Sequence, residues 1–272
     1  MTLTVQGGKV HLVDEGRGTP TLFLHGNPDS ADVWRGVIAD MKGEYRCLAP
    51  DLPGFGRSEA LPHLDPSGDG VARWVDDLVT AIGITEPLNL VVHDFGGPFG
   101  LAWAAKYPQK IKSIAVLNTV FHGSYRWHFW GRVWRTPILG ELSMMVMSRF
   151  AMRQEMRRGS PTLTNEQIDE TYALMSPAMK QTVLKLYRAT DPAKLGDWEQ
   201  RLLAVTAQVP TIVVWGDLDP YIPSHYADRF GARRVRHFKQ WGHWMQMEAP
   251  HEVADELLAF FGEHAEPMRK TG

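Results

Sequence analysis

The stretch LNLVVHDFGGPFGLAWAAKYP, residues 88–108, predicts a β-strand, a sharp turn and an α-helix in direct succession. Asp94 stands at the tip of that turn, and Gly96 and Gly97 follow it closely. Glycines just beyond such a tip allow the helix to pack near the strand, and the tip presents its side chain for reaction. The alternative is that Asp94 only caps the start of the helix. The residues in the other loops decide between the two.

Short apolar segments alternate with helical segments on both sides of this stretch. Further strands are predicted at residues 20–24, 45–50, 111–119, 210–217 and 233–238, with an edge strand at 9–16. Helices are predicted at residues 30–41, 71–84 and 252–264, the second of them ending near Gly83. Such alternation is typical of a parallel sheet with helices on both faces. The sequence therefore predicts an α/β fold with a mostly parallel, eight-stranded-type sheet flanked by helices.

One long segment breaks the alternation. Residues 121–204 have helical periodicity and no convincing strand, and they hold seven of the twelve methionines and four of the ten tryptophans. We interpret this segment as a helical cap inserted into a core formed by residues 1–120 and 205–272. Most of these Met and Trp side chains are expected to be ordinary packing. A cap with an apolar, adaptable lining would nevertheless suit a pocket for small hydrophobic substrates.

Composition and charge exclude several classes of protein. The net charge of the 272 residues is −2, so no basic field favours nucleic acid or an anionic membrane as a partner. Cys47 is the single cysteine, and the start of the chain lacks the pattern of a signal peptide. No cluster has metal-ligand spacing and no loop is typical of a phosphate site, so no metal or other cofactor is expected. We expect a cytoplasmic monomer or homodimer.

Four polar loops follow predicted strands, at residues 25–30, 93–97, 215–220 and 239–244. Ligands of parallel sheets bind at the carboxyl ends of the strands, so these loops are expected to meet. His243 lies in the last of them, at a Gly-containing turn before the closing helix. The third loop offers two acids, Asp219 and Asp217, of which we favour Asp219, although either could be a turn aspartate. The order nucleophile, acid, histidine is that of a hydrolytic triad.

A carboxylate nucleophile favours a particular chemistry. Unlike a serine hydroxyl, a carboxylate with an ordinary pKa near 4 is ionised at neutral pH and needs no base to attack. Asp94 could therefore displace a leaving group from saturated carbon, which would leave an ester on the enzyme. His243 would then be needed only to activate the water that hydrolyses this ester. Alkyl halides or epoxides suit this scheme better than ordinary esters.

Taken together, HGNP (25–28), DLPGFGRS (51–58), the stretch around Asp94, WGDLDPYIP (215–223) and QWGHWMQMEAP (240–250) resemble the α/β-hydrolase superfamily. The resemblance covers nearly the whole chain. Within the superfamily the chain is most similar to the haloalkane dehalogenases, in which an Asp nucleophile, a histidine and a second acid work together. The resemblance implies backbone N–H donors at the HGNP loop and at Phe95, which follows the nucleophile. It also implies that the Asn27 side chain binds the leaving halide.

The chain departs from this family at one halide donor. Haloalkane dehalogenases carry a Trp directly after the nucleophile, whereas the side chain of Phe95 has no indole N–H to donate. A tryptophan of the cap could replace it, and the candidates are Trp127, Trp130 and Trp134.

Two alternatives remain open. The chain also resembles the epoxide hydrolases, which use the same triad and need cap tyrosines that protonate the ring oxygen. Tyr187 precedes an arginine late in the cap, as is common in that family, and Tyr125 or Tyr172 could be the second tyrosine. Asn27, however, stands where that family usually has an aromatic residue. The other alternative is a non-enzymatic ligand receptor that keeps the fold and the pocket.

Overall fold

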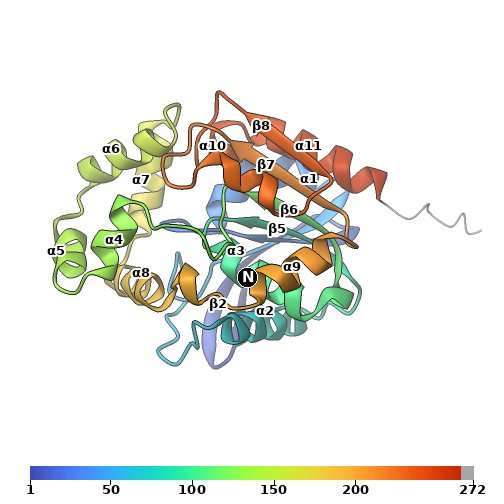
Figure 1. Ribbon diagram of the computed structural model, residues 1–272, viewed down its shortest axis with the longest axis horizontal. Coiled ribbons are helices and arrows are strands. Elements are labelled where there is room, and N and C mark those ends of the chain that lie inside the picture. The colour runs from blue at the N-terminus through green and yellow to red at the C-terminus, as the bar shows by residue number, and fades with distance from the viewer. Residues whose placement is uncertain (265–272) are drawn as a thin grey trace, which may run out of the picture.

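The predicted strands form one eight-stranded sheet in the computed structural model, which describes residues 1–264 (Figure 1). The strands are β1 (Thr2–Val5), β2 (Gly8–Glu15), β3 (Thr19–Leu24), β4 (Tyr45–Pro50), β5 (Leu88–His93), β6 (Ile111–Leu117), β7 (Thr211–Gly216) and β8 (Arg234–Phe238). Their order across the sheet is β1-β2-β4-β3-β5-β6-β7-β8. The pairs β1–β2 and β2–β4 are antiparallel and all other neighbours are parallel, which confirms the predicted fold class.

The prediction of an edge strand at residues 9–16 is wrong. β2 lies between β1 and β4, and β1 occupies the edge of the sheet. β1 escaped prediction because it is only four residues long and mostly exposed, so it lacks the apolar run of a central strand. The turn at Gln6 and Gly7, both with positive φ, folds it back onto β2 as a hairpin.

Helices cover both faces of the sheet. They are α1 (Arg35–Met41), α2 (Gly68–Ile82), α3 (Gly96–Lys106), α4 (Phe129–Arg135), α5 (Leu139–Val146), α6 (Arg149–Gly159), α7 (Asn165–Ala173), α8 (Pro177–Ala189), α9 (Trp198–Thr206), α10 (Met245–Glu248) and α11 (Pro250–Glu263). Short 3₁₀ segments are η1 (Ala31–Trp34), η2 (Pro108–Lys110), η3 (Pro192–Lys194) and η4 (Ser224–Arg229). α2 ends at Gly83, which has a φ of 82° as its C-cap, so the predicted end of this helix is confirmed.

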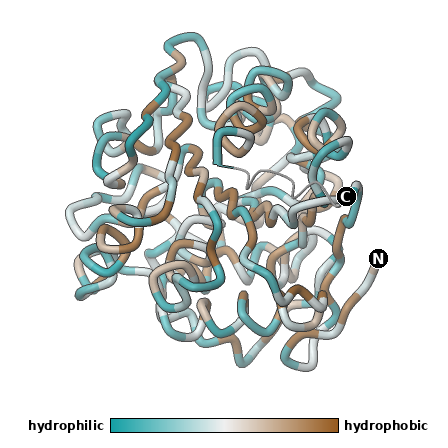
Figure 2. The backbone as a smooth tube through the Cα atoms, turned by 90° about the vertical axis from the view of Figure 1, so that its right-hand side faces the viewer, coloured by the Kyte–Doolittle hydropathy of each residue, from teal (hydrophilic) through white to brown (hydrophobic). Residues whose placement is uncertain are grey.

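The core is divided by the sheet into two apolar layers. α1 and α11 pack together on one face, and α2, α3 and α9 pack on the other. Figure 2 shows the hydrophobic segments running through the middle of the molecule, where the strands lie. β5 is buried along its whole length because both of its faces are covered, and this explains its mostly apolar sequence.

Between β6 and β7 the chain forms α4 to α9 and η3, without a strand. α4 to α8 lie together beyond one end of the sheet, whereas α9 packs against α3 (Figure 1). The division into a core and a cap at residues 121–204 remains a prediction, and the position of α9 favours a cap that ends before this helix. Residues 265–272 of the predicted core lie outside the described residues. No helix among residues 1–264 is long and apolar enough to cross a membrane.

Candidate active site

The loops that the sequence singled out meet at the carboxyl ends of neighbouring strands. β3 and β5 run parallel with Leu24 opposite Val92, so the HGNP loop and Asp94 leave the sheet side by side. β7 and β8 continue the parallel sheet, so the loops that carry Asp219 and His243 reach the same edge. The chain crosses from β4 to β5 over β3 at this point, and such a switch point is where parallel sheets bind ligands.

Asp94 occupies a strained turn between β5 and α3. Its φ of 46° lies in the left-handed region, which costs a residue with a side chain about 1–3 kcal/mol. The Thr119 hydroxyl donates to the Asp94 carbonyl and holds the turn. A Cβ at Gly96 would lie 2.2 Å from the carbonyl oxygen of Leu24, so only glycine allows α3 to start this close to β3. The structure thus places the Asp94 side chain at a tip, as predicted.

The two oxygens of Asp94 have different surroundings. Oδ1 accepts the backbone N–H of Asn27 at 2.7 Å, and the backbone N–H of Phe95 also acts to lower the pKa of the carboxyl group. Oδ2 lies 3.7 Å from Nε2 of His243, which is too long for a direct hydrogen bond. Burial raises the pKa of Asp94, against the opposing effect of His243 and of the two N–H donors. The ordinary pKa assumed from the sequence is therefore corrected, because Asp94 is withdrawn from water.

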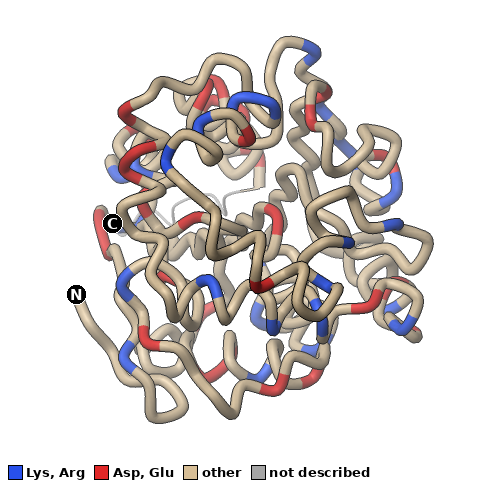
Figure 3. Tube along the Cα trace, turned by 90° about the vertical axis from the view of Figure 1, so that its left-hand side faces the viewer, with Lys and Arg blue, Asp and Glu red and all other residues tan. Residues whose placement is uncertain are grey.

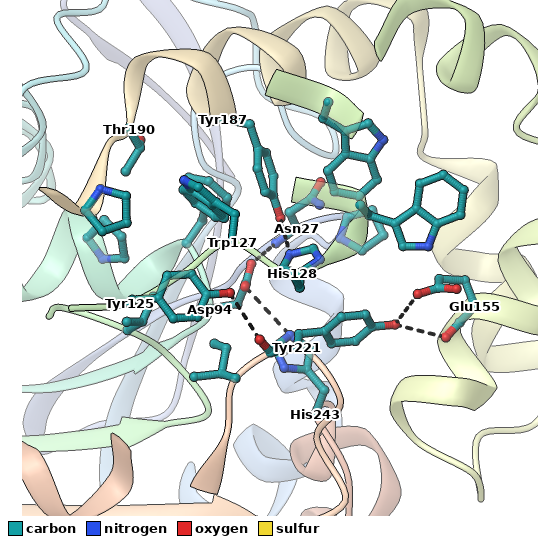
Figure 4. A pocket seen from close by; sticks show the side chains of 18 of the residues that line it. Asn27, Asp94, Tyr125, Trp127, His128, Glu155, Tyr187, Thr190, Tyr221 and His243 are labelled. Carbon is teal, nitrogen blue, oxygen red and sulfur yellow. Dashed lines mark hydrogen bonds and ion pairs between the residues drawn. The ribbon is translucent and has the colours of Figure 1, made fainter. Parts of the chain in front are cut away.

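His243 is held between the two acids. Its Nδ1 is 2.7 Å from Oδ2 of Asp219, and its side chain is almost completely buried. Burial alone would lower the pKa of His243, but the charges of Asp219 and Asp94 outweigh it and raise the pKa to about 9. His243 therefore carries a proton at neutral pH in the resting protein. In Figure 4, a dashed line marks the ion pair between Asp94 and His243.

Asp219 and Asp217, left open by the sequence, have different positions. Asp219 is buried and accepts N–H bonds from Tyr221 and Ile222 at Oδ1, and from the Asn118 side chain at Oδ2. Asp217 instead pairs with His237 at 2.7 Å on the exposed side of the loop. The structure thus brings Asp219, and not Asp217, to His243.

The pocket beside Asp94 is lined mostly by apolar side chains and has a volume of about 130 Å³. Five of the seven methionines of residues 121–204 line it, so pocket lining rather than packing alone accounts for most of them. All predicted binding residues also line it: Asn27, Phe95, Trp127, Trp130, Trp134 and Tyr187. Of the two candidates for a second tyrosine, Tyr125 lines the pocket and Tyr172 does not.

Polar groups near Asp94 are few, and most of them are donors. The Tyr187 hydroxyl, the Asn27 side chain and His128 lie close together above Asp94 in Figure 4. Tyr187 packs against Phe95, with ring centroids 4.9 Å apart. The indole N–H of Trp127 is buried without a hydrogen-bond partner among the described residues. Among residues 1–264, no three His, Cys, Asp or Glu side chains group as metal ligands.

Sequence reasoning missed several polar residues around the site, and three of them lie close to its chemistry. His128 and Tyr221 line the pocket, and no recognisable spacing marks either of them. Asp29 lies behind it, where burial raises its pKa to about 7 although the indole N–H of Trp244 donates to its Oδ2 at 3.0 Å. Its position directly after HGNP was the only available signal for Asp29.

Comparisons with known proteins agree with this geometry. Residues 19–250 match the α/β hydrolase fold family. A cis-3-alkyl-4-alkyloxetan-2-one decarboxylase of Shewanella oneidensis is 28% identical over 281 residues, covering 96% of this chain and 87% of the relative. Haloalkane dehalogenase 2 of Mycobacterium tuberculosis is 26% identical over 267 residues, covering 94% and 92%. The crystal structure of an ancestral haloalkane dehalogenase has a TM-score of 0.80 at 23% identity, covers 97% and 99%, and shows the fold alone. These matches confirm the resemblance seen in the motifs and the prediction of an α/β-hydrolase enzyme.

Proposed function

Because the chain belongs to the α/β-hydrolase fold family, we propose that it hydrolyses small haloalkanes through an ester formed on Asp94. One observation carries this proposal: a carboxylate occupies the strained tip, with His243 3.7 Å from its Oδ2 and Asp219 behind the histidine. A serine in this position would need His243 to remove its proton before attack. A carboxylate needs no base for attack and leaves His243 for a later step.

In the first step, Oδ2 of Asp94 attacks the carbon that bears the halogen. The new carbon–oxygen bond forms as the carbon–halogen bond breaks, and the halide departs with the bonding electrons. Although burial raises the pKa of Asp94, the protonated His243 beside it favours the ionised carboxylate. The hydrogen bond from the Asn27 N–H to Oδ1 fixes the carboxylate, so that Oδ2 is the oxygen free to react.

In the second step, His243 first loses its proton to solvent and then takes a proton from water as the water oxygen attacks Cγ of Asp94. The bond between Cγ and the alkyl oxygen then breaks, His243 returns the proton to the departing alcohol, and the Asp94 carboxylate forms again. The backbone N–H groups of Asn27 and Phe95 stabilise the negative charge that develops on Oδ1. Formation of the ester removes the charge of Asp94, which is one of the causes that raise the pKa of His243. His243 therefore becomes a neutral base more readily after the first step than before it.

Donors around the pocket replace the side-chain N–H that Phe95 lacks. The Asn27 amide, the Tyr187 hydroxyl and the indole N–H of Trp127 all belong to residues that line it. Each such donor is typically worth about 3–4 kcal/mol when it is aimed at a developing anion in a dry site. A halide is a weak base and needs such donors without needing a proton. The volume of about 130 Å³ suits a substrate of a few carbon atoms.

Epoxide hydrolysis is the second candidate, and the Tyr187 hydroxyl is the observation that favours it. Tyr187 is 3% exposed, and the nearby charge of Asp94 contributes to its raised pKa, so the phenol stays protonated. A protonated phenol could give its proton to the ring oxygen as Asp94 opens an epoxide. A non-enzymatic receptor would not need Asp94, His243 and Asp219 to be arranged as a triad.

A substrate panel tests the proposal. Bromide release from 1-bromobutane is measured beside diol formation from 1,2-epoxybutane and turnover of a cis-3-alkyl-4-alkyloxetan-2-one, the compound class in the name of the Shewanella relative. We expect bromide release by the wild type, none by Asp94→Asn, and an alkylated protein in intact-mass spectra of His243→Ala. A single turnover in ¹⁸O-labelled water should place the label in the Asp94 carboxylate.

The possible outcomes separate the alternatives. Diol formation without bromide release from any short bromoalkane would replace the proposal by epoxide hydrolysis. Unlabelled enzyme after productive turnover would refute the ester on Asp94. Reversible binding without product or adduct would indicate a receptor.

A further inference from the structure

His128 lies in the segment that leads into α4 and accepts a hydrogen bond from the backbone of that helix. Its Nδ1 is 3.2 Å from the backbone nitrogen of Gly131 and caps the helix. A ring nitrogen that accepts an N–H bond carries no proton. Burial lowers the pKa of His128 to about 4, so the ring is neutral at pH 7 and its one proton is on Nε2.

Nε2 of His128 points toward the hydroxyl of Tyr187, at a distance of 3.5 Å (Figure 4). Because Nε2 carries the proton, it is the donor of this pair and the phenol oxygen accepts. The distance is at the long end for a hydrogen bond. The tautomer set by the Gly131 N–H thus determines the direction of the bond between His128 and Tyr187.

The direction of this bond matters because a phenol has only one proton to donate. If Nε2 of His128 were unprotonated, Tyr187 would donate its proton to the histidine, away from the reacting atoms. With Nε2 protonated, the Tyr187 proton is not donated to His128 and can point toward the pocket, on the side where Asn27 lies. Tyr187 is fixed for this task, because its ring packs against Phe95, Trp127 and Trp134 with centroids 4.8–4.9 Å apart.

We propose that His128 is a positioning residue that directs the Tyr187 hydroxyl proton toward the departing halide beside Asn27. The inference rests on the proposed function, because it deepens the account of how the halide is held. In this arrangement Tyr187 takes the place of the indole donor that is absent at Phe95. His128 itself touches neither the halide nor the carbon under attack, and acts only through Tyr187.

A double-mutant cycle tests this inference. His128→Asn keeps a side-chain acceptor for the cap of α4 but is too short to reach Tyr187. We expect it to slow chloride release from 1-chlorobutane about three- to tenfold, the usual effect of one neutral hydrogen bond. Iodide accepts hydrogen bonds more weakly than chloride, so release from 1-iodobutane should change less. His128→Asn combined with Tyr187→Phe should be no slower than Tyr187→Phe alone.

A matched cycle provides the control. Val120 also lines the pocket and has no hydrogen bond to His128, so the effects of Val120→Ala and His128→Asn on chloride release should add. Additive losses for His128→Asn and Tyr187→Phe, or equal losses for chloride and iodide, would overturn the inference.

A binding measurement separates this inference from the proposed function, because it needs no turnover. Bromide is titrated into wild type, His128→Asn, Tyr187→Phe and the double variant, and the quenching of tryptophan fluorescence is followed. We expect weaker binding in each single variant and no further loss in the double variant. Coupled bromide binding without halide release from any bromoalkane would keep the inference and refute the proposed function. No bromide binding by the wild type would overturn the inference even if an enzyme-bound ester forms.

Discussion

Replacement of Asp219 by Asn should stop the second step while sparing the first. Every group around this carboxylate is a donor: the N–H groups of Tyr221 and Ile222 at Oδ1, and Asn118 and Nδ1 of His243 at Oδ2. A carboxamide must turn its NH₂ toward one of these sites. At Oδ1 it would meet two fixed backbone N–H groups, so we expect the NH₂ to take the place of Oδ2.

In that position the NH₂ group donates to Nδ1 of His243 and reverses the tautomer of the ring. The proton then resides on Nε2, which faces Asp94, and Nε2 can no longer accept a proton from water. In a Ser-His-Asp triad, a histidine held in the wrong tautomer by the same Asp-to-Asn change lowers the rate about 10⁴-fold. This loss corresponds to about 5.5 kcal/mol in activation free energy. We expect a similar loss in hydrolysis of the ester. Attack by Asp94 uses no base and should slow much less.

Rapid-quench measurement of halide release shows the two steps separately. Asp219→Asn should release one halide per protein in a burst and then almost stop, and intact-mass spectra should show an alkylated protein. Asp217→Asn is the matched control, because Asp217 pairs with the exposed His237 and should turn over like the wild type. Steady turnover by Asp219→Asn near the wild-type rate, or a loss confined to Asp217→Asn, would refute this reasoning.

Three further predictions concern the same site. Asn27→Ala should lower halide release about a hundredfold, the usual loss for one such donor, and a colorimetric halide assay that finds less than a fivefold loss would contradict it. Gly26→Ala would place a Cβ 2.3 Å from Cβ of Asp94, so we expect about 1–3 kcal/mol of destabilisation in thermal unfolding together with loss of halide release. The rate at which the alkyl-enzyme ester is hydrolysed should fall as the pH drops below the pKa of His243, since only the neutral ring is a base. Its midpoint should lie below the value of about 9 for the resting protein, because the ester has removed the charge of Asp94, and a midpoint at or above 9 would argue against this scheme.

The sequence alone determined the fold class and the loops that meet at the site. The central strands are mostly apolar because both faces of the sheet are covered, and this pattern can be recognised locally, for example in residues 88–93. The sharp turn at Asp94 followed from the same stretch, because a strand, a tip and two glycines suffice to indicate it. The position of His243 followed from the order of the elements, since the carboxyl ends of parallel strands share one edge.

Other features were decided by the tertiary structure, because they depend on where side chains point across the fold. Asp217 and Asp219 share one turn, and only their packing shows that one faces His237 and the other His243. β1 could not be placed at the edge from its own four residues, because pairing with β2 defines it as a strand.

The pKa shifts in the site could not be predicted from the local sequence either. Burial raises the pKa of Asp94, and the charges of Asp94 and Asp219 raise that of His243 to about 9. The rise at Asp94 comes from desolvation, whereas the rise at His243 comes from the charges of carboxylates in other loops, which outweigh its own desolvation. His128 shows the same limit, because its contact with Tyr187 joins residues 59 positions apart, and only the folding of α4 against α8 brings them together.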